Sequence, residues 1–135
     1  MTAEYYKISQ REIDSVLSES PEKRFEYTIK RIADWETLWT IVDEAGALGM
    51  LTDEVQNVIF PIWPFKEFTQ LYCTGDFANY TPMVIELSDF LEEYLPDYEN
   101  KNYKLSLLPL PTKKGEVMDI SLFREALNSE LNKIE

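Results

Sequence analysis

The sequence predicts an α+β fold, in a single domain with a mixed sheet, and three observations lead to this class. The 135 residues are 44% hydrophobic and 13% aromatic, which is enough to build one packed core. Apolar residues recur at helical spacing in some segments and at strand spacing in others. The expected order of helices and strands is ααβββαβαβα. We expect one domain over residues 1–135, in which residues 1–8 form a flexible N-terminus.

Two amphipathic helices are expected at the start of the chain. Ser9 and Glu12 have the spacing of a capping box. Ser20 is expected to cap a second helix, with Pro21 at its first position, where a missing N–H costs nothing. Each helix carries apolar residues on one face, so we expect both to pack on the core from one side. These residues are Ile13, Val16 and Leu17 in the first helix and Phe25, Ile29, Ile32 and Ala33 in the second.

A three-stranded antiparallel meander is expected next. Residues 36–43 are rich in β-branched and aromatic side chains, which favour a strand. Polar turns at 43–46 and 52–56 would separate it from a short return strand at 47–51 and a third strand at 57–63.

The most apolar stretch of the chain runs from Val58 to Cys73. Pro61 and Pro64 interrupt it, which excludes a single helix or a membrane span. We interpret it as a buried strand at Val58–Trp63, followed by a helix that Pro64 helps to start. This corner would join the antiparallel front half to the back half.

The back half is expected to alternate strands and helices. Such strand-helix-strand units imply some parallel pairing. The expected segments are a loop at 74–82, a strand at 83–87, a helix capped by Ser88 and ended by Pro96, a turn at 97–102, a strand at 103–108, a turn at 113–115, a short strand at 116–119 and a last helix from Ser121.

Several of these segments together resemble a small bacterial family, catalogued as domain of unknown function 2750. They are Phe25-Glu26-Tyr27, Trp39, Pro61-Ile62-Trp63-Pro64 and Val84–Leu91. The resemblance covers residues 22–132 and implies no catalytic residues, because no activity is established for the family. By association with other small acidic families, it favours an immunity or antitoxin-type binding protein.

The charge of the chain bears on its partners. The formal net charge is −12, and residues 51–100 contain ten acidic side chains against one basic side chain, Lys66. Binding to a nucleic-acid backbone needs clustered cations, so we expect no nucleic-acid partner. A basic protein is the partner that an acidic face would suit.

The residues that usually carry catalysis are scarce. The chain contains no histidine, which excludes His-dependent triads and His-containing zinc sites. Its single cysteine, Cys73, has no second thiol to pair with and is interpreted as a structural thiol. The four glycines form no phosphate-binding loop. We therefore expect no cofactor and no catalytic residues.

A metal site is also not expected. Asp43, Glu44, Asp53 and Glu54 would bind Mg²⁺ or Ca²⁺ only if the two turns of the meander met. Turns at opposite ends of a strand lie about 17 Å apart. Solvation of the turns is the simpler explanation of these carboxylates.

Our first functional hypothesis is a non-enzymatic acidic protein-binding module that neutralises a basic protein such as a toxin. The binding rim would consist of Asp76, Tyr80, Glu92, Glu93 and Asp97. The alternative is a small-molecule binder or a carboxylate-dependent enzyme with a pocket near Trp63 and the 74–82 loop. A third reading is a structural or oligomerising subunit.

The setting is expected to be cytoplasmic. Residues 1–6 lack the basic and apolar regions of a secretory signal, and no stretch has the apolar length of a membrane span.

Overall fold

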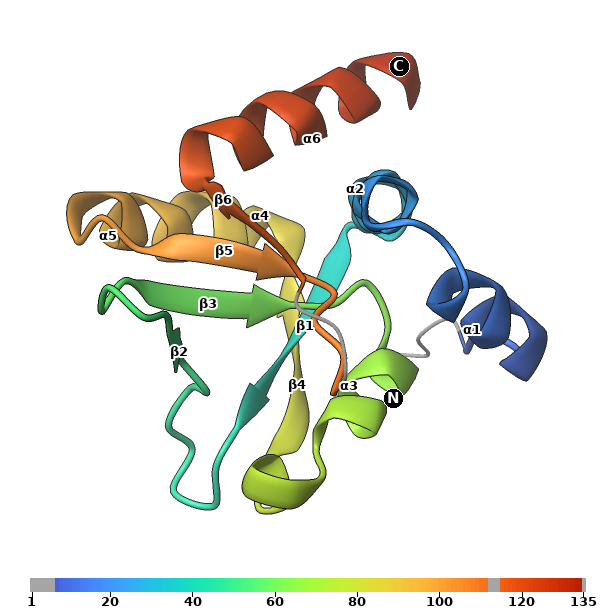
Figure 1. Cartoon of the computed structure of the whole chain (residues 1–135). Coiled ribbons are helices and arrows are strands. Elements are labelled where there is room, and N and C mark those ends of the chain that lie inside the picture. Colours follow the sequence, from blue (N-terminus) through green and yellow to red (C-terminus); the bar gives the residue numbers. More distant parts are fainter. Residues whose placement is uncertain (1–6, 112–114, 135) are drawn as a thin grey trace, which may run out of the picture.

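Two β-sheets meet at the centre of the molecule in the computed structural model, which describes residues 7–111 and 115–134 (Figure 1). The strands are β1 (Thr37–Val42), β2 (Leu51–Thr52), β3 (Val58–Ile62), β4 (Thr81–Glu86), β5 (Lys104–Leu107) and β6 (Glu116–Asp119). The smaller sheet pairs β1 with β4, and the larger sheet has the order β2-β3-β5-β6. Strands β3 and β5 are parallel, whereas all other neighbours are antiparallel. The α+β class and the mixed sheet are confirmed.

Helices complete the fold, and α6 lies beside α2 (Figure 1). The helical segments are α1 (Gln10–Leu17), α2 (Pro21–Trp35), α3 (Lys66–Tyr72), the 3₁₀ turn η1 (Gly75–Phe77), α4 (Leu87–Asp89), the π-helical turn η2 (Phe90–Tyr94), α5 (Leu95–Asn100) and α6 (Ile120–Ile134). The caps predicted at Ser9 and Ser20 are present, since Ser9 accepts a hydrogen bond from the Glu12 N–H and Ser20 accepts one from the Lys23 N–H. The cap predicted at Ser88 is wrong, because α4 begins one residue earlier, at Leu87, with Glu86 as its N-cap. No helix in the described ranges is long and apolar enough to cross a membrane.

The core has two clusters. The larger one joins α2, α6 and the α4–η2–α5 run to β3 and β5, with Phe60 and Phe90 stacked 6.1 Å apart at its centre. The smaller one packs α1 and α3 beside β1 and contains Trp63 and Phe68, both 0% exposed. Each helix therefore buries one face, as the sequence predicts.

The pairing of β1 differs from the predicted meander. All six residues of β1 pair with β4, from Thr37 opposite Glu86 to Val42 opposite Thr81. The segment after β1 keeps only an isolated bridge, between Val42 and Leu48. That segment contains two glycines and two alanines, which are poor strand formers, whereas β4 offers β-branched apolar residues to the buried β1. The meander prediction is wrong for β1 and correct for the antiparallel β2–β3 pair.

The predicted corner after Val58 is present, with its helix displaced. Pro61 lies beyond the two residues of β3 that pair with β2, so its missing N–H breaks no bond of that pair, and its carbonyl accepts a 2.8 Å hydrogen bond from the Thr40 hydroxyl of β1. Backbone hydrogen bonds between Trp39 and Trp63, of 2.8 and 2.9 Å, then link β1 to the end of β3. Helix α3 begins at Lys66, so Pro64 precedes the helix instead of starting it.

Pro96 does not end its helix, contrary to the prediction. The helical run from Leu87 passes through Pro96 to Asn100, so the predicted turn at 97–102 is largely helical. In the π-helical turn just before Pro96, the Leu95 N–H donates a hydrogen bond to the carbonyl of Phe90, five residues back. This wider turn accommodates a proline that the tighter α-helical ladder would exclude.

Two predictions fall partly outside the described residues. Residues 1–6 of the expected flexible N-terminus are not described, whereas Ile8 is 6% exposed and belongs to the smaller core cluster. Residues 113 and 114 of the predicted turn at 113–115 are also not described.

Candidate functional site

The five residues predicted to form one rim lie at two ends of β4. Asp76 and Tyr80 precede the strand, in and after η1, and Glu92, Glu93 and Asp97 follow it, in η2 and α5. A six-residue strand spans roughly 20 Å, so the structure does not bring the two groups together. The two groups are thus separated by β4, and partner binding by these five residues stays a prediction.

The group before β4 is small and partly packed. Asp76 is exposed, and the half-buried ring of Tyr80 lies 5.3 Å from that of Phe77. Tyr80 also covers Gly49, where an added Cβ would come within 3.0 Å of the tyrosine ring. Its packing in the smaller core cluster explains this aromatic residue.

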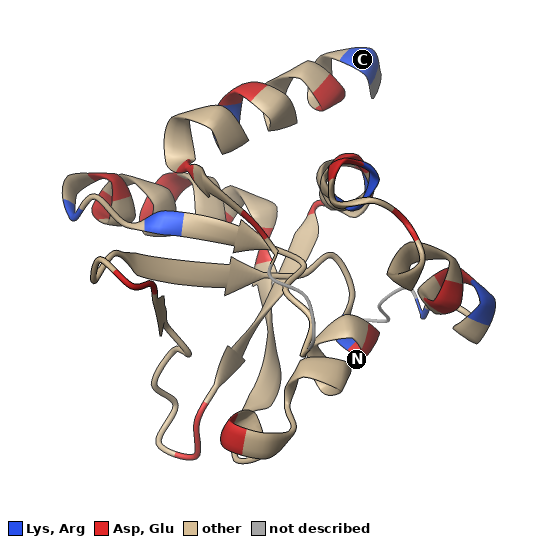
Figure 2. Cartoon of the chain, viewed as in Figure 1, with Lys and Arg blue, Asp and Glu red and all other residues tan. Residues whose placement is uncertain are grey.

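The group after β4 belongs to a longer acidic run. Glu86, Asp89, Glu92 and Glu93 are all exposed, and none forms an ion pair with another described residue. We call these four residues the acidic helix surface. Figure 2 marks acidic positions in red along the ribbon of this helical run.

Further along the run, the acids are neutralised. Asp97 pairs with Lys101 at 2.9 Å, and Glu99 pairs with Arg124 at 2.7 Å. The opposite side of the run is apolar and buried, through Leu87, Phe90, Leu95 and Tyr98. The backbone therefore holds the acidic helix surface toward solvent.

The predicted pocket near Trp63 is displaced outward. Trp63 is 0% exposed, its ring lies 5.2 Å from that of Tyr72, and its Nε1–H donates a 2.8 Å hydrogen bond to the Pro109 carbonyl. Tyr72 and Pro109 line a groove of about 750 Å³ on their outer side. Trp63 thus supports the wall of this groove without lining it.

We call this cavity the loop groove, because η1 and the residue before it form one of its walls. It is mostly apolar, and Asp53 and Asp76 are its charged groups among the described residues. Its lining residues are Leu51, Thr52, Asp53, Ile59, Tyr72, Thr74, Gly75, Asp76, Phe77, Ser106, Pro109, Leu110, Pro111, Gly115 and Val117.

Asp53 has a structural task at the edge of the loop groove. Its carboxylate accepts hydrogen bonds from the side-chain and backbone N–H groups of Asn57 and from the Val55 N–H. The bonds from Asn57 are the main reason that the pKa of Asp53 lies below its ordinary value. This carboxylate is therefore ionised at neutral pH and closes the turn between β2 and β3.

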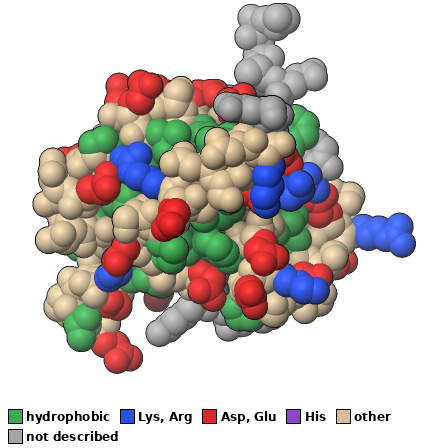
Figure 3. Space-filling model, turned by 90° about the horizontal axis from the view of Figure 1, so that it is seen from above, with side chains coloured by type: hydrophobic (Ala, Val, Ile, Leu, Met, Phe, Trp, Pro, Cys, Tyr) green, Lys and Arg blue, Asp and Glu red, His purple; other side chains and the backbone are tan. Residues whose placement is uncertain are grey.

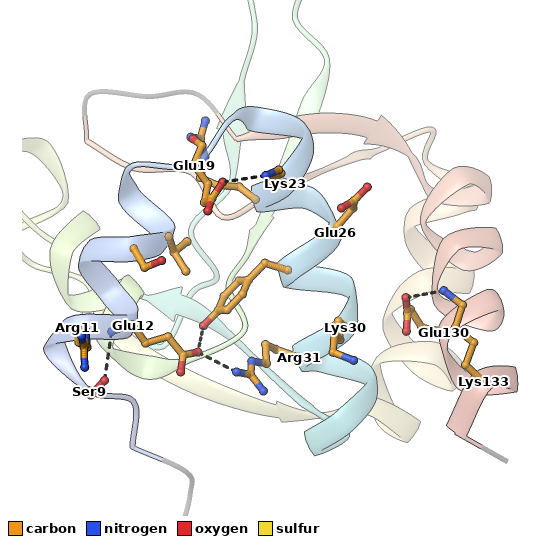
Figure 4. Close-up of a pocket in the computed structure, with 14 residues that line it drawn as sticks. Ser9, Arg11, Glu12, Glu19, Lys23, Glu26, Lys30, Arg31, Glu130 and Lys133 are labelled. Atoms are coloured by element: carbon orange, nitrogen blue, oxygen red, sulfur yellow. Dashed lines mark hydrogen bonds and ion pairs between the residues drawn. The ribbon is translucent and has the colours of Figure 1, made fainter.

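A second cavity, the charged groove, lies between α1, α2 and the end of α6 (Figure 4). Its volume is about 1040 Å³, and ten of its fourteen lining residues are charged. The cations are Arg11, Lys23, Arg24, Lys30, Arg31 and Lys133, the acids are Glu12, Glu19, Glu26 and Glu130, and Ser9, Ser15, Val16 and Tyr27 complete the lining. The groove therefore has an excess of two positive charges in a chain whose formal charge is −12.

One network crosses the charged groove from α1 to α2. Glu12 accepts a 2.5 Å hydrogen bond from the Tyr27 hydroxyl and pairs with Arg31 at 3.3 Å (Figure 4). Arg31 also lies over the Tyr27 ring, 5.5 Å from its centre. Burial, and then the bond to Glu12, raises the pKa of Tyr27, so its phenol remains a donor.

Sequence reasoning missed this network. Glu12 has the spacing of a capping-box residue, but its side chain contacts Tyr27 of α2, which lies fifteen residues further along the chain. Arg24 did leave a signal, since it stands four residues before the buried Thr28 and eight before the buried Ile32, on the inward face of α2. A cation on a buried helix face indicates an electrostatic site.

The face that contains α6 and α2 carries both signs of charge. Seen from that side, acidic and basic side chains alternate around hydrophobic ones (Figure 3). Leu122 of α6 is one exposed apolar residue, at 51%. This face therefore differs from the single-sign acidic helix surface.

Two other predicted features involve Cys73 and the turn carboxylates. Burial raises the pKa of the half-buried Cys73 thiol, which keeps it protonated. Asp43 accepts hydrogen bonds from the Ala45 and Ala47 N–H groups, so it closes its turn much as Asp53 does. In the part of the chain that the structure describes, no three His, Cys, Asp or Glu residues are grouped to hold a metal ion.

These features define a small acidic α+β domain with an acidic helix surface and two grooves. A family model described as "Protein of unknown function (DUF2750)" matches residues 25–127 of this 135-residue chain. The chain belongs to the DUF2750 family. The match excludes α1 and the first four residues of α2, which form much of the charged groove. No curated protein matches the chain.

Proposed function

We propose that this protein is a non-enzymatic binding module whose acidic helix surface captures a basic protein, in the manner of an immunity or antitoxin-type protein. The observation that supports this proposal is the row of four exposed carboxylates without cationic partners among the described residues. Like charges on adjacent helical turns repel one another. A basic partner would relieve that repulsion.

The charge of the remaining chain favours the same kind of partner. A net charge of −12 produces an attractive field for basic proteins at a distance, and the acidic helix surface would orient them at contact. Such complementarity acts mainly on the association rate and on specificity, and it weakens with salt. Binding should therefore be sensitive to ionic strength.

The test compares two variants of equal charge. Asp89→Asn, Glu92→Gln and Glu93→Gln together neutralise three of the four carboxylates of the acidic helix surface, and a control neutralises three exposed acids elsewhere. The control combines Glu44→Gln, Glu54→Gln and Glu125→Gln. We expect the wild type and the control to capture the same basic protein from a cell lysate at about 0.1 M salt, where the Debye length is about 10 Å.

We expect the surface variant to lose that protein, and about 1 M salt to release it from the wild type. Mass spectrometry of the captured fraction gives the readout. Equal retention by both variants would contradict the proposal, and so would retention that ignores salt.

The loop groove supports a second candidate function, the binding of a small molecule. Its volume of about 750 Å³ lies within the range of ligand pockets, and aromatic and aliphatic side chains dominate its lining. Phe77→Ala would remove one wall at the half-buried end of η1. A library screen by ligand-observed NMR should find compounds that bind the wild type but not this variant. Compounds that bind both proteins equally would show that they bind outside the loop groove.

A further inference from the structure

The charged groove contains a buried cation that no carboxylate in the described ranges neutralises. Arg24 is 6% exposed and lines the groove. Its guanidinium donates a hydrogen bond to the backbone carbonyl of Glu19, five residues earlier, and forms no ion pair with a described residue. The guanidinium has five N–H donors, and since none of its nitrogens is both fully buried and without a hydrogen-bond partner, the donors that do not bind Glu19 reach the open groove.

The position of Arg24 is unfavourable for a cation in two respects. Removing a charge from water costs free energy unless an opposite charge compensates it. Arg24 is also the fourth residue of the fifteen-residue helix α2, at the end where the helix dipole is positive. An anion beside the guanidinium would relieve both penalties.

The acids of the charged groove do not provide that anion. Three of the four are bound to other groups: Glu12 to Tyr27 and Arg31, Glu19 to Lys23 at 3.9 Å, and Glu130 to Lys133 at 3.2 Å (Figure 4). Arg11, Arg24 and Lys30 then stand without an ion pair among the described residues, against Glu26 alone. Arg31 also pairs at 4.0 Å with Asp34, which lies outside the groove lining, so Arg11, Arg24 and Lys30 are the cations that a ligand could neutralise.

We propose that the charged groove binds the phosphate group of a small phosphate monoester and that Arg24 holds it. The planar guanidinium fork matches two oxygens of a phosphate. A phosphate monoester carries about −1.5 to −2 charge at neutral pH, which balances the excess in the groove, whereas a monocarboxylate balances only half of it. This site is separate from the acidic helix surface, and Arg24 precedes the residues that match the DUF2750 family.

The experiment is an NMR titration of the ¹⁵N-labelled protein with glycerol 3-phosphate and with acetate, at matched ionic strength. Glycerol 3-phosphate should shift the amide signals of Glu19, Ser20 and residues 22–24 and the Arg24 side-chain signal in a saturable way, and acetate should not. Arg24→Gln should weaken binding about tenfold or more, since it removes a charge-assisted contact. Arg24→Lys keeps the charge but lacks the planar fork, so it should bind glycerol 3-phosphate several-fold more weakly than the wild type does.

Lys101→Gln is the matched control. Lys101 is an exposed cation that does not line the charged groove, so this substitution should leave binding unchanged. Circular dichroism establishes that each variant is folded; if Arg24→Gln unfolds, Arg24→Lys decides. The proposal is overturned if glycerol 3-phosphate gives no saturable shift, if acetate binds equally well, or if the folded Arg24 variants bind as the wild type does.

Discussion

The Tyr27 hydroxyl donates a 2.5 Å hydrogen bond to the Glu12 carboxylate and thereby fastens α1 to α2 across the charged groove. Arg31 pairs with the same carboxylate at 3.3 Å, so a single acid holds two groups of α2. The smaller core cluster, which includes Ile13 and Val16 of α1, completes this attachment.

Removing the Tyr27 hydroxyl should loosen this attachment. We expect Tyr27→Phe to lower the free energy of unfolding by about 1–2 kcal/mol, because the lost hydrogen bond has a charged acceptor and is half-exposed. Urea unfolding of Tyr27→Phe, Glu12→Gln and the double variant gives the coupling energy, which should be about 0.5 kcal/mol or more. Tyr103→Phe is the control, since its hydroxyl forms no hydrogen bond with a described residue. Additive losses would show that the two residues act independently.

Trp63 should be important for stability without taking part in binding. It is 0% exposed, and its indole N–H donates to the Pro109 carbonyl at 2.8 Å. Trp63→Phe leaves a cavity and an unsatisfied carbonyl, so we expect a loss of about 2–4 kcal/mol in unfolding free energy. Trp35→Phe, at a residue that is 45% exposed, should cost about 0.5 kcal/mol or less. If urea unfolds both variants at similar midpoints, the predicted contribution of the buried Trp63 to stability is contradicted.

The hydrogen-bonded Asp53 carboxylate should make the free energy of unfolding depend on pH. Its native pKa is lower than the ordinary value of 3.8, chiefly because Asn57 donates to the carboxylate. The stabilisation is therefore fully present above pH 3.8 and is lost as the pH falls through the native pKa. As the pH falls through the native pKa, the difference in unfolding free energy between the wild type and Asp53→Ala should become smaller. In Asn57→Ala, a ¹³C titration should find the pKa of Asp53 raised toward 3.8, and an unchanged value would contradict this cause.

Local signals in the sequence predicted much of the fold. The caps at Ser9 and Ser20 and the strand-forming residues of β1 act within a few residues, so their elements appear where expected. The pairing of β1 with β4 depends on a competition between distant segments, which no local pattern reveals. The helix through Pro96 required a π-helical turn that the sequence does not signal.

The candidate sites were less predictable. Hydrophobic periodicity correctly places Glu92 and Glu93 on an exposed helix face, but it does not reveal that β4 separates them from Asp76. The charged groove depends on the angle at which α1 meets α2, and this angle follows from tertiary packing.

The most direct test of the central claim is the affinity of the captured basic partner for the acidic helix surface, measured by biolayer interferometry at several salt concentrations. We predict that the affinity falls steadily with salt. We also predict that the combined Asp89→Asn, Glu92→Gln and Glu93→Gln variant binds about tenfold more weakly, mainly through a slower association rate. An affinity that is independent of salt and equal in wild type and variant would contradict the account.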